Sequence, residues 1–161
     1  MTKIPKTNAI RILEQKKSAF DVLTFDADEA VSGVEAANRM GIDVKNVYKT
    51  LVTVGKSGAH YVFVVPVAEE LDLRKAAVAA GEKNIAMIHS KELLPLTGYI
   101  HGGCSPIGMK KAFPTFIDTS AEALDFMVFS GGRIGLQVKM APDSLIKAAN
   151  ATYKDLVLDR N

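Results

Sequence analysis

Two glycine-rich segments constrain this chain more than any other feature of its sequence. The first is Gly98-Tyr-Ile-His-Gly-Gly-Cys-Ser-Pro-Ile-Gly108, followed by Lys110 and Lys111, and the second is Ser130-Gly-Gly-Arg-Ile-Gly135. Glycine lacks a Cβ, so it adopts positive φ and exposes backbone N–H groups, which a core-forming helix or strand rarely requires. Both segments therefore predict loops in which the backbone approaches a ligand.

Length and composition limit the class of protein. The 161 residues are 48% hydrophobic, so we expect one domain over residues 1–161. The apolar runs are too short for a membrane helix of about 20 residues, the first residues lack a secretory signal pattern, and one cysteine forms no internal disulfide. These features favour the cytoplasm without a membrane partner. A net charge of +2 is low for a DNA-binding domain, and it permits a nucleic-acid partner without requiring one.

Hydrophobic periodicity predicts irregularly mixed helices and strands, and hence an α+β domain with a mixed or barrel-like β-sheet and flanking helices. Helices are expected at 8–17, 33–40, 73–80, 91–94 and 142–149. Strands are expected at 20–25, 47–54, 60–65, 85–88, 115–118, 126–130 and 134–140. Pro95 is expected to end the fourth helix, and Gly131–Gly132 to form a tight turn between the last two strands.

Lys49 is the most unusual residue within a predicted strand. Alternation places it on the same side as Val47 and Leu51, and Thr50 on the opposite side. Burying an ammonium group costs several kcal/mol unless the group is paired or reaches a polar cavity. Lys49 therefore lies either in a pocket wall or on a solvated face, where edge strands commonly carry lysine. Thr50 is the weaker candidate.

The glycine segments also contain residues that suggest other chemistry. The spacing from Gly103 to Lys110 differs from a phosphate-binding P-loop, because Met109 intervenes and no Ser or Thr follows the lysine. A Cys104–His101 nucleophile pair lacks a nearby orienting carboxylate, and the histidines and cysteine lack zinc-site spacing. We expect no metal and no cofactor. Backbone N–H groups of the loops can instead bind a carbonyl, a ribose or a phosphate.

Two further sets of residues allow both a functional and an ordinary interpretation. Ser130 can contribute a hydroxyl to a site, although serine before Gly-Gly is also common in turns. A basic group near the loops can neutralise phosphates or can simply be a solvated face. Its members are Lys110, Lys111, Arg133 and Lys139.

Nearly the whole chain resembles the YbaK/EbsC family of aminoacyl-tRNA deacylases. The resemblance rests on Val47-Tyr-Lys-Thr-Leu51, the stretch 66–75 that ends in Leu-Asp-Leu-Arg-Lys, and the two glycine segments. It implies a compact α+β fold related to the editing domain of bacterial prolyl-tRNA synthetases, and removal of a small aminoacyl group from mischarged tRNA, notably Cys-tRNA(Pro).

The same resemblance implies roles for particular residues. It assigns the catalytic lysine to Lys49, and substrate binding to Thr50, Gly102, Gly103, Ser130 and Gly131. Attack would come from the thiol of the cysteinyl substrate or from water, which agrees with the lack of a recognisable protein nucleophile. The expected partners are the aminoacylated 3′ end of tRNA and, for tRNA selection, prolyl-tRNA synthetase.

Two expected binding positions depart from the family pattern. Phe25 stands where a tyrosine is expected, and Gln137 stands where an aspartate is expected. These changes remove a phenolic hydroxyl and a carboxylate. Three functions therefore stay open: a Cys-tRNA(Pro) deacylase, a deacylase for another small aminoacyl group such as Ala-tRNA(Pro), or a non-catalytic module that binds tRNA ends or a synthetase.

Overall fold

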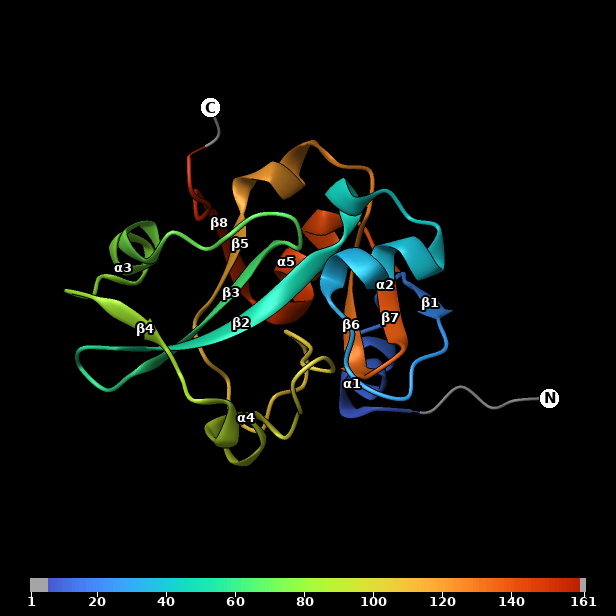
Figure 1. Ribbon diagram of the computed structural model, residues 1–161, viewed down its shortest axis with the longest axis horizontal. Coiled ribbons are helices and arrows are strands. Elements are labelled where there is room, and N and C mark those ends of the chain that lie inside the picture. Colours follow the sequence, from blue (N-terminus) through green and yellow to red (C-terminus); the bar gives the residue numbers. More distant parts are fainter. Residues whose placement is uncertain (1–5, 160–161) are drawn as a thin grey trace.

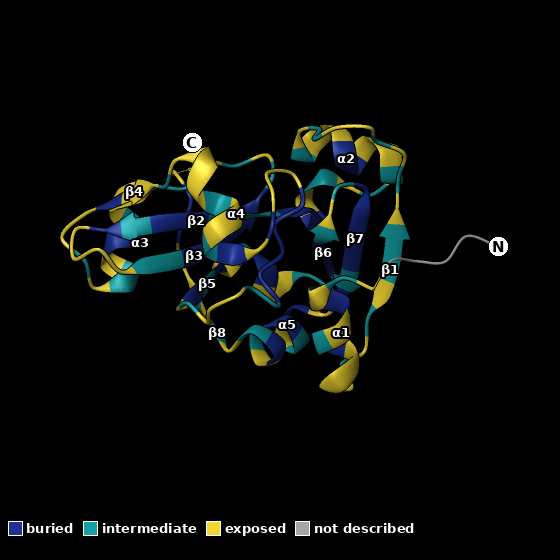
Figure 2. Ribbon diagram, turned by 90° about the horizontal axis from the view of Figure 1, so that it is seen from below, coloured by how far each residue is buried: buried dark blue, intermediate teal, exposed yellow. Residues whose placement is uncertain are grey.

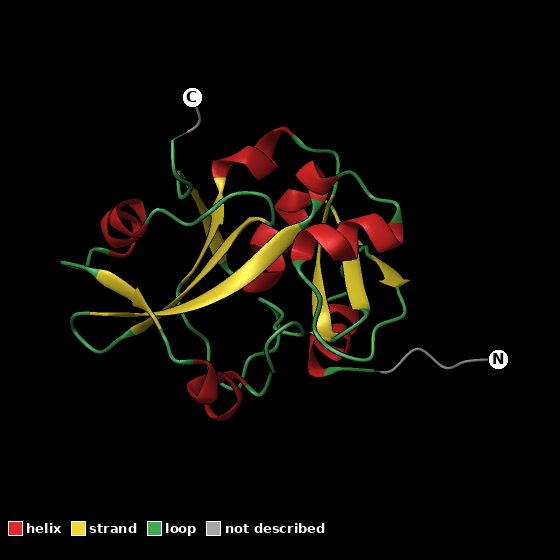
Figure 3. Cartoon of the chain, in the orientation of Figure 1, coloured by secondary structure: helices red, strands yellow, loops and turns green. Residues whose placement is uncertain are grey.

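The computed structural model describes residues 6–159 and contains two β-sheets with helices around them (Figures 1 and 3). The α-helices are α1 (Asn8–Gln15), α2 (Gly33–Met40), α3 (Leu73–Ala80), α4 (Ser90–Thr97) and α5 (Pro142–Ala149). Short 3-10 helices are η1 (Val44–Asn46) and η2 (Thr119–Ala123). The strands are β1 (Asp21–Thr24), β2 (Tyr48–Gly55), β3 (His60–Pro66), β4 (Ile85–Met87), β5 (Thr115–Asp118), β6 (Met127–Arg133), β7 (Leu136–Met140) and β8 (Ala151–Lys154).

The two sheets are open and differ in topology. The larger has the strand order β4-β2-β3-β5-β8 and mixes antiparallel and parallel pairs, whereas the smaller, β1-β7-β6, is antiparallel. A single parallel bridge between Val47 and Val128 joins them just before β2 and within β6. The expected α+β class is confirmed, and the sheet is mixed rather than a closed barrel.

Helices cover both faces of the smaller sheet. Figure 2 shows α2 on one side of β6 and β7, and α1 and α5 on the other. The α1 and α5 side packs Leu13 and Leu145 against Phe129 in the main core, while Ala37 of α2 packs with Val47 and Val128. The larger sheet packs Phe63 and Val65 against α3. Among the described residues, no helix is long and apolar enough to span a bilayer.

Local signals in the sequence explain most element boundaries. Ser32 caps α2 by accepting a hydrogen bond from the Glu35 N–H (3.1 Å), and Asp72 caps α3 through the N–H groups of its first turn. Gly41 and Gly81 then end these helices in the left-handed conformation. The sequence Ser32-Gly-Val-Glu35 predicts a capping box. The Glu35 carboxylate binds Arg39 and does not complete it.

The expected end of α4 at Pro95 is wrong, because the helix continues to Thr97. Proline removes one N–H donor, but the next turn is closed by other groups. The Thr97 hydroxyl donates to the Leu93 carbonyl (2.7 Å), and the Gly98 N–H donates to the Leu94 carbonyl (2.9 Å).

β8 is an element that the periodicity did not reveal, since its exposed and half-buried residues make a short strand at a sheet edge.

The expected turn at Gly131–Gly132 is also wrong. β6 continues through both glycines to Arg133, and the chain reverses at Ile134–Gly135. Ser130 pairs with Gln137 whereas Arg133 pairs with Leu136, so the two glycines form an irregularity in the ladder. Such bulges re-aim neighbouring side chains, and this one lies next to Ser130.

Candidate active site

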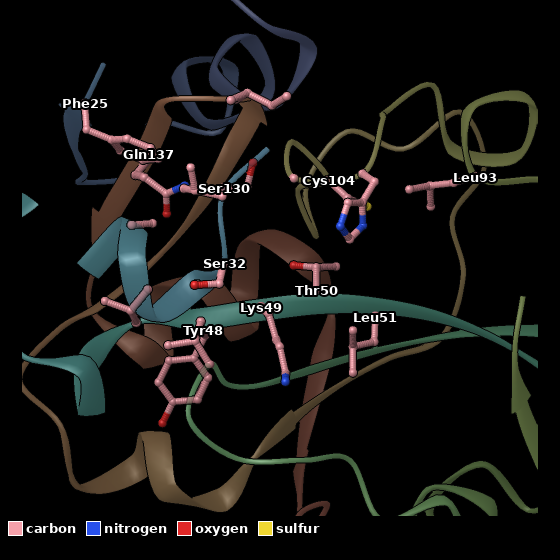
Figure 4. Close-up of a pocket in the computed structure, with 18 residues that line it drawn as sticks. Phe25, Ser32, Tyr48, Lys49, Thr50, Leu51, Leu93, Cys104, Ser130 and Gln137 are labelled. Atoms are coloured by element: carbon pink, nitrogen blue, oxygen red, sulfur yellow. The ribbon is translucent and has the colours of Figure 1, made fainter. Parts of the chain in front are cut away.

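A pocket of about 220 Å³ opens where the two sheets meet. The bridge between Val47 and Val128 fixes this junction, from which β2 and β6 carry their next residues into the pocket wall. The wall is formed by Phe25, Val31, Ser32, Gly33, Ala36, Val47, Tyr48, Lys49, Thr50, Leu51, Val67, Leu93, His101, Gly102, Cys104, Ser130, Ile134 and Gln137. Most of them belong to β2, the start of α2, the two glycine segments and β7, and Figure 4 labels ten of the eighteen.

Most of the residues expected in the site lie in this wall. Lys49, Thr50, Gly102, Ser130, Phe25 and Gln137 all line it. Gly103 and Gly131 are absent from the lining and lie in the segments that support it. One site therefore collects residues that are separated by up to 112 positions in the sequence, from Phe25 to Gln137.

Lys49 and Thr50 leave β2 on opposite sides, as the strand alternation predicts (Figure 4). Lys49 is half-buried, and within residues 6–159 its ammonium has no ion pair or hydrogen bond. The Thr50 hydroxyl is buried and has no hydrogen-bond partner in the same range. An unsatisfied buried hydroxyl costs about 1–3 kcal/mol, so both groups favour a ligand that supplies partners.

Ser130 and Gln137 form a polar pair across β6 and β7. They are register partners, and Figure 4 shows them on the same side of the pocket, with Phe25 beyond Gln137. The Ser130 hydroxyl accepts a hydrogen bond from the Gly132 N–H (3.2 Å) and keeps its own proton available. Phe25 is held by its N–H, which donates to the Gly135 carbonyl (2.9 Å).

Hydrogen bonds hold the first glycine segment in a fixed conformation beside the pocket. The Tyr99 hydroxyl donates to the Ile107 carbonyl (2.6 Å), and the Asn8 amide donates to the Gly108 carbonyl (2.6 Å). Burial raises the pKa of Tyr99 to about 12, which keeps this hydroxyl a donor at neutral pH. Cross-loop hydrogen bonds of this kind hold Gly102 and Cys104 in place beside the pocket.

The two glycine segments are in contact with each other. Some of their glycines are required for this packing between the segments as well as for the shape of the pocket. A Cβ on Gly103 would lie 3.0 Å from the Ile134 nitrogen and 3.1 Å from Arg133 backbone atoms. A Cβ on Gly131 would lie 3.2 Å from Leu136 Cγ. Close approach to a ligand is therefore not the only reason for these glycines.

The N-terminus of α2 is a part of the site that the sequence interpretation missed. Ser32 and Gly33 line the pocket, and a Cβ on Gly33 would overlap Val67. The first turn of a helix leaves N–H groups without intrahelical partners and carries partial positive charge. The Ser-x-x-Glu pattern predicted the helix start, but only the fold brings that start to the pocket.

Cys104 is unsuited to act as a nucleophile. It is 8% exposed, and burial raises the pKa of its thiol to about 12, so the reactive thiolate is scarce at neutral pH. His101 lies in the same wall, but no hydrogen bond joins the two side chains among residues 6–159. Within that range no cluster of His, Cys, Asp or Glu side chains could hold a metal ion.

We expect iodoacetamide to alkylate Cys104 in the folded protein at pH 8 at least about a hundredfold more slowly than a free thiol, because thiolate is the reacting form. Mass spectrometry measures the rate directly, since the chain contains one cysteine. The guanidinium-unfolded chain is the control and should react at the ordinary rate. Rapid labelling of the folded protein would restore the Cys104–His101 pair as a candidate.

The basic residues near the loops do not form one group. Lys110, Lys111 and Arg133 are exposed on the two glycine segments. Lys139 instead lies over the Phe126 ring, 4.3 Å from its centroid, and its register partners are Asp21 and Val128. Lys110, Lys111 and Arg133 are therefore placed to neutralise phosphates, whereas Lys139 is not.

The aminoacyl-tRNA editing domain model matches residues 28–148, which include the pocket wall except Phe25. The chain belongs to the aminoacyl-tRNA editing domain family. A candidate Cys-tRNA(Pro)/Cys-tRNA(Cys) deacylase of Enterococcus faecalis (strain ATCC 700802 / V583), EbsC, is 40% identical over 152 residues, 94% of this chain and 93% of its own. The resemblance to the YbaK/EbsC family is thereby confirmed.

Solved structures agree with this editing-domain assignment. A candidate trans-editing enzyme for prolyl-tRNA synthetase has a TM-score of 0.82 and 26% identity, over 97% of this chain and all of that one. The hypothetical protein APE2540 has a TM-score of 0.85 at 21% identity, over 94% of this chain and all of that one, and it supports the fold alone. The editing-domain fold thus extends over nearly the whole chain.

Proposed function

We propose that this editing-domain protein hydrolyses mischarged aminoacyl-tRNA, with Cys-tRNA(Pro) as its substrate. The observation that carries the proposal is the pocket wall, which contains Lys49 without an ion pair in residues 6–159, the buried Thr50 hydroxyl, Ser130 and residues of both glycine segments. The name of the 40% identical relative supports the substrate. Such an activity belongs with translation and would place the protein in the cytoplasm.

The residues suit cleavage of an ester without a protein nucleophile. A nucleophile adds to the acyl carbon, and backbone N–H groups of the Gly102 segment and of α2 stabilise the negative charge that develops on the carbonyl oxygen. The bond from the acyl carbon to the 3′ oxygen then breaks, and this oxygen leaves with a proton. Lys49 leaves β2 on the side opposite to Thr50, which suits contact with the terminal phosphate.

Two attacking groups fit this pocket. The thiol of a cysteinyl substrate can form the new bond to its own acyl carbon, giving a cyclic thioester while its proton passes to the departing 3′ oxygen. Water can attack instead and gives the free amino acid. The neutral, buried Cys104 thiol supports both routes over attack by the protein.

The small pocket also explains why an editing step is useful. A hydrophobic pocket separates substrates that differ by one methylene by only about 1–3 kcal/mol, so a synthetase for a small amino acid mischarges its tRNA. Phe25 and Gln137 present an aromatic ring and a neutral amide here, which also favours an alanyl group. Ala-tRNA(Pro) is therefore the second candidate substrate.

Selection of the tRNA is proposed to involve prolyl-tRNA synthetase. The two glycine segments carry three exposed cations, Lys110, Lys111 and Arg133, which is a small surface for reading a whole tRNA. Purified protein is therefore expected to hydrolyse Cys-tRNA(Pro) and Cys-tRNA(Cys) at similar rates. Strong discrimination by the protein alone would make the synthetase unnecessary.

Single-turnover hydrolysis tests the proposed activity. Cys-tRNA(Pro), Ala-tRNA(Pro) and Pro-tRNA(Pro) are each mixed with excess protein, and the remaining ester is measured over time. We expect the cysteinyl ester to disappear far faster than its spontaneous hydrolysis, with the prolyl ester spared. Faster loss of the alanyl ester would identify the second candidate, and tight binding without turnover would identify a non-catalytic module.

A further inference from the structure

Among the described residues, the wall of the pocket contains positive and neutral side chains but no carboxylate. Lys49 carries the ammonium, and the α2 N-terminus adds partial positive charge. The other titratable side chains of the wall are Tyr48, His101 and Cys104, none of which supplies an anion at neutral pH. Within residues 6–159, a ligand that enters this pocket therefore meets no carboxylate that would neutralise a positive charge.

Acidic side chains on the surrounding elements do not place a carboxylate in the pocket wall either. Asp26, Asp28 and Glu29 lie in the connection from β1 to α2, are exposed, and are absent from the wall. Glu35 of α2 is paired with Arg39 at 3.0 Å. Asp21 of β1 lies opposite Lys139, away from the Ser130 and Gln137 pair.

Gln137 is the polar side chain best placed to bind the α-substituent of the acyl group. It is 7% exposed, lines the pocket, and its side-chain amide makes no hydrogen bond within residues 6–159. The amide offers a donor and an acceptor, so it can bind a neutral amine or a hydroxyl equally well. It cannot neutralise an ammonium group.

We infer that the pocket accepts acyl groups whose α-substituent is uncharged, with Gln137 as the specificity-determining residue. The inference rests on the proposed function and names its substrate class: aminoacyl esters in the neutral-amine form, and 2-hydroxyacyl esters. An α-amino group has an ordinary pKa of about 8, so much of it is protonated at neutral pH. Burying that charge in a wall that offers no carboxylate among residues 6–159 is unfavourable.

The test compares two esters on the same tRNA(Pro). One is the cysteinyl or alanyl ester, whichever is hydrolysed faster, and the other is its 2-hydroxyacyl counterpart. The ratio of kcat/KM, amino over hydroxy, is measured from pH 6 to pH 9, which cancels the pH dependence of the attacking group. We expect the ratio to rise about tenfold per pH unit below the amine pKa and to level off above it.

A second measurement uses variants at Gln137. Gln137→Glu supplies the missing carboxylate, so we expect the amino-to-hydroxy ratio at pH 6.5 to rise at least tenfold, while Gln137→Met, of similar size, leaves the ratio at low pH unimproved. Thermal unfolding identifies variants that do not fold, and the wild-type pH series then decides alone. A wild-type ratio that is flat or falls with pH overturns the inference, whereas failure to hydrolyse either ester overturns the proposed function as well.

Discussion

Replacing Lys49 by alanine is expected to lower the single-turnover rate of Cys-tRNA(Pro) hydrolysis by about a hundredfold or more. Lys49 is half-buried in the pocket wall and its ammonium group is unpaired within the described range, so its free energy of interaction is available to the substrate. Losing the contact to the terminal phosphate misplaces the reacting ester, and a small misplacement costs about 10²-fold in rate. Rapid-quench measurement of the remaining ester gives the rate.

Thermal unfolding and two further lysine variants distinguish a role of Lys49 in catalysis from a role in folding. Because Lys49 makes no ion pair with any residue from 6 to 159, Lys49→Ala should leave the thermal unfolding midpoint nearly unchanged. Lys49→Arg should recover part of the rate by restoring the charge. Lys56→Ala removes an exposed lysine just beyond the other end of β2 and should have no effect. A Lys49→Ala rate within threefold of the wild type would contradict the proposed role.

Replacing Gly102 by alanine is expected to lower both stability and activity. Gly102 has φ +85°, and a Cβ there would lie 2.6 Å from the Ala30 Cβ. The left-handed conformation costs a residue with a side chain about 1–2 kcal/mol, and the contact must also be relieved by moving the pocket wall. We expect the free energy of unfolding to fall by about 1–3 kcal/mol and hydrolysis to slow by more than tenfold.

Gly58 provides the matched control for Gly102. It also has positive φ, at +92°, but it lies at the β2–β3 hairpin and a Cβ there would meet nothing within 4 Å. Gly58→Ala should therefore lower the free energy of unfolding by about 1–2 kcal/mol, the conformational cost alone, and leave hydrolysis unchanged. Denaturant unfolding and the hydrolysis assay distinguish the two variants. Equal activities would show that the Gly102 wall is not part of the site.

Local physical signals predicted most of the fold. Caps such as Ser32 and Asp72, and left-handed stops such as Gly41 and Gly81, act within a few residues and so can be read from the sequence. The errors occur where distant groups decide the outcome. α4 continues beyond Pro95 because Thr97 and Gly98 form the hydrogen bonds that close the following turn. The glycines after Ser130 form an irregular strand because β7 continues to pair with β6 beyond them.

The candidate site was predictable in its chemistry but not in its assembly. Lys49 was unusual in a strand pattern, and alternation correctly set Thr50 on the opposite side. No local pattern indicates that Gly33 of α2 lies at the same pocket, because that depends on how α2 packs on the smaller sheet. The placement of Gly103 and Gly131 behind the wall likewise follows from contacts between segments far apart in the sequence.

A crystal structure with a stable substrate analogue, cysteinyl-adenosine joined by a 3′-amide in place of the ester, tests most directly whether this pocket is the active site. We expect the cysteinyl group between β2 and the Ser130–Gln137 pair, with Thr50 or Ser130 within hydrogen-bond distance and the adenosine toward the Gly102 segment. Binding at another surface, with the pocket between the two sheets left empty at saturating analogue, would contradict this expectation.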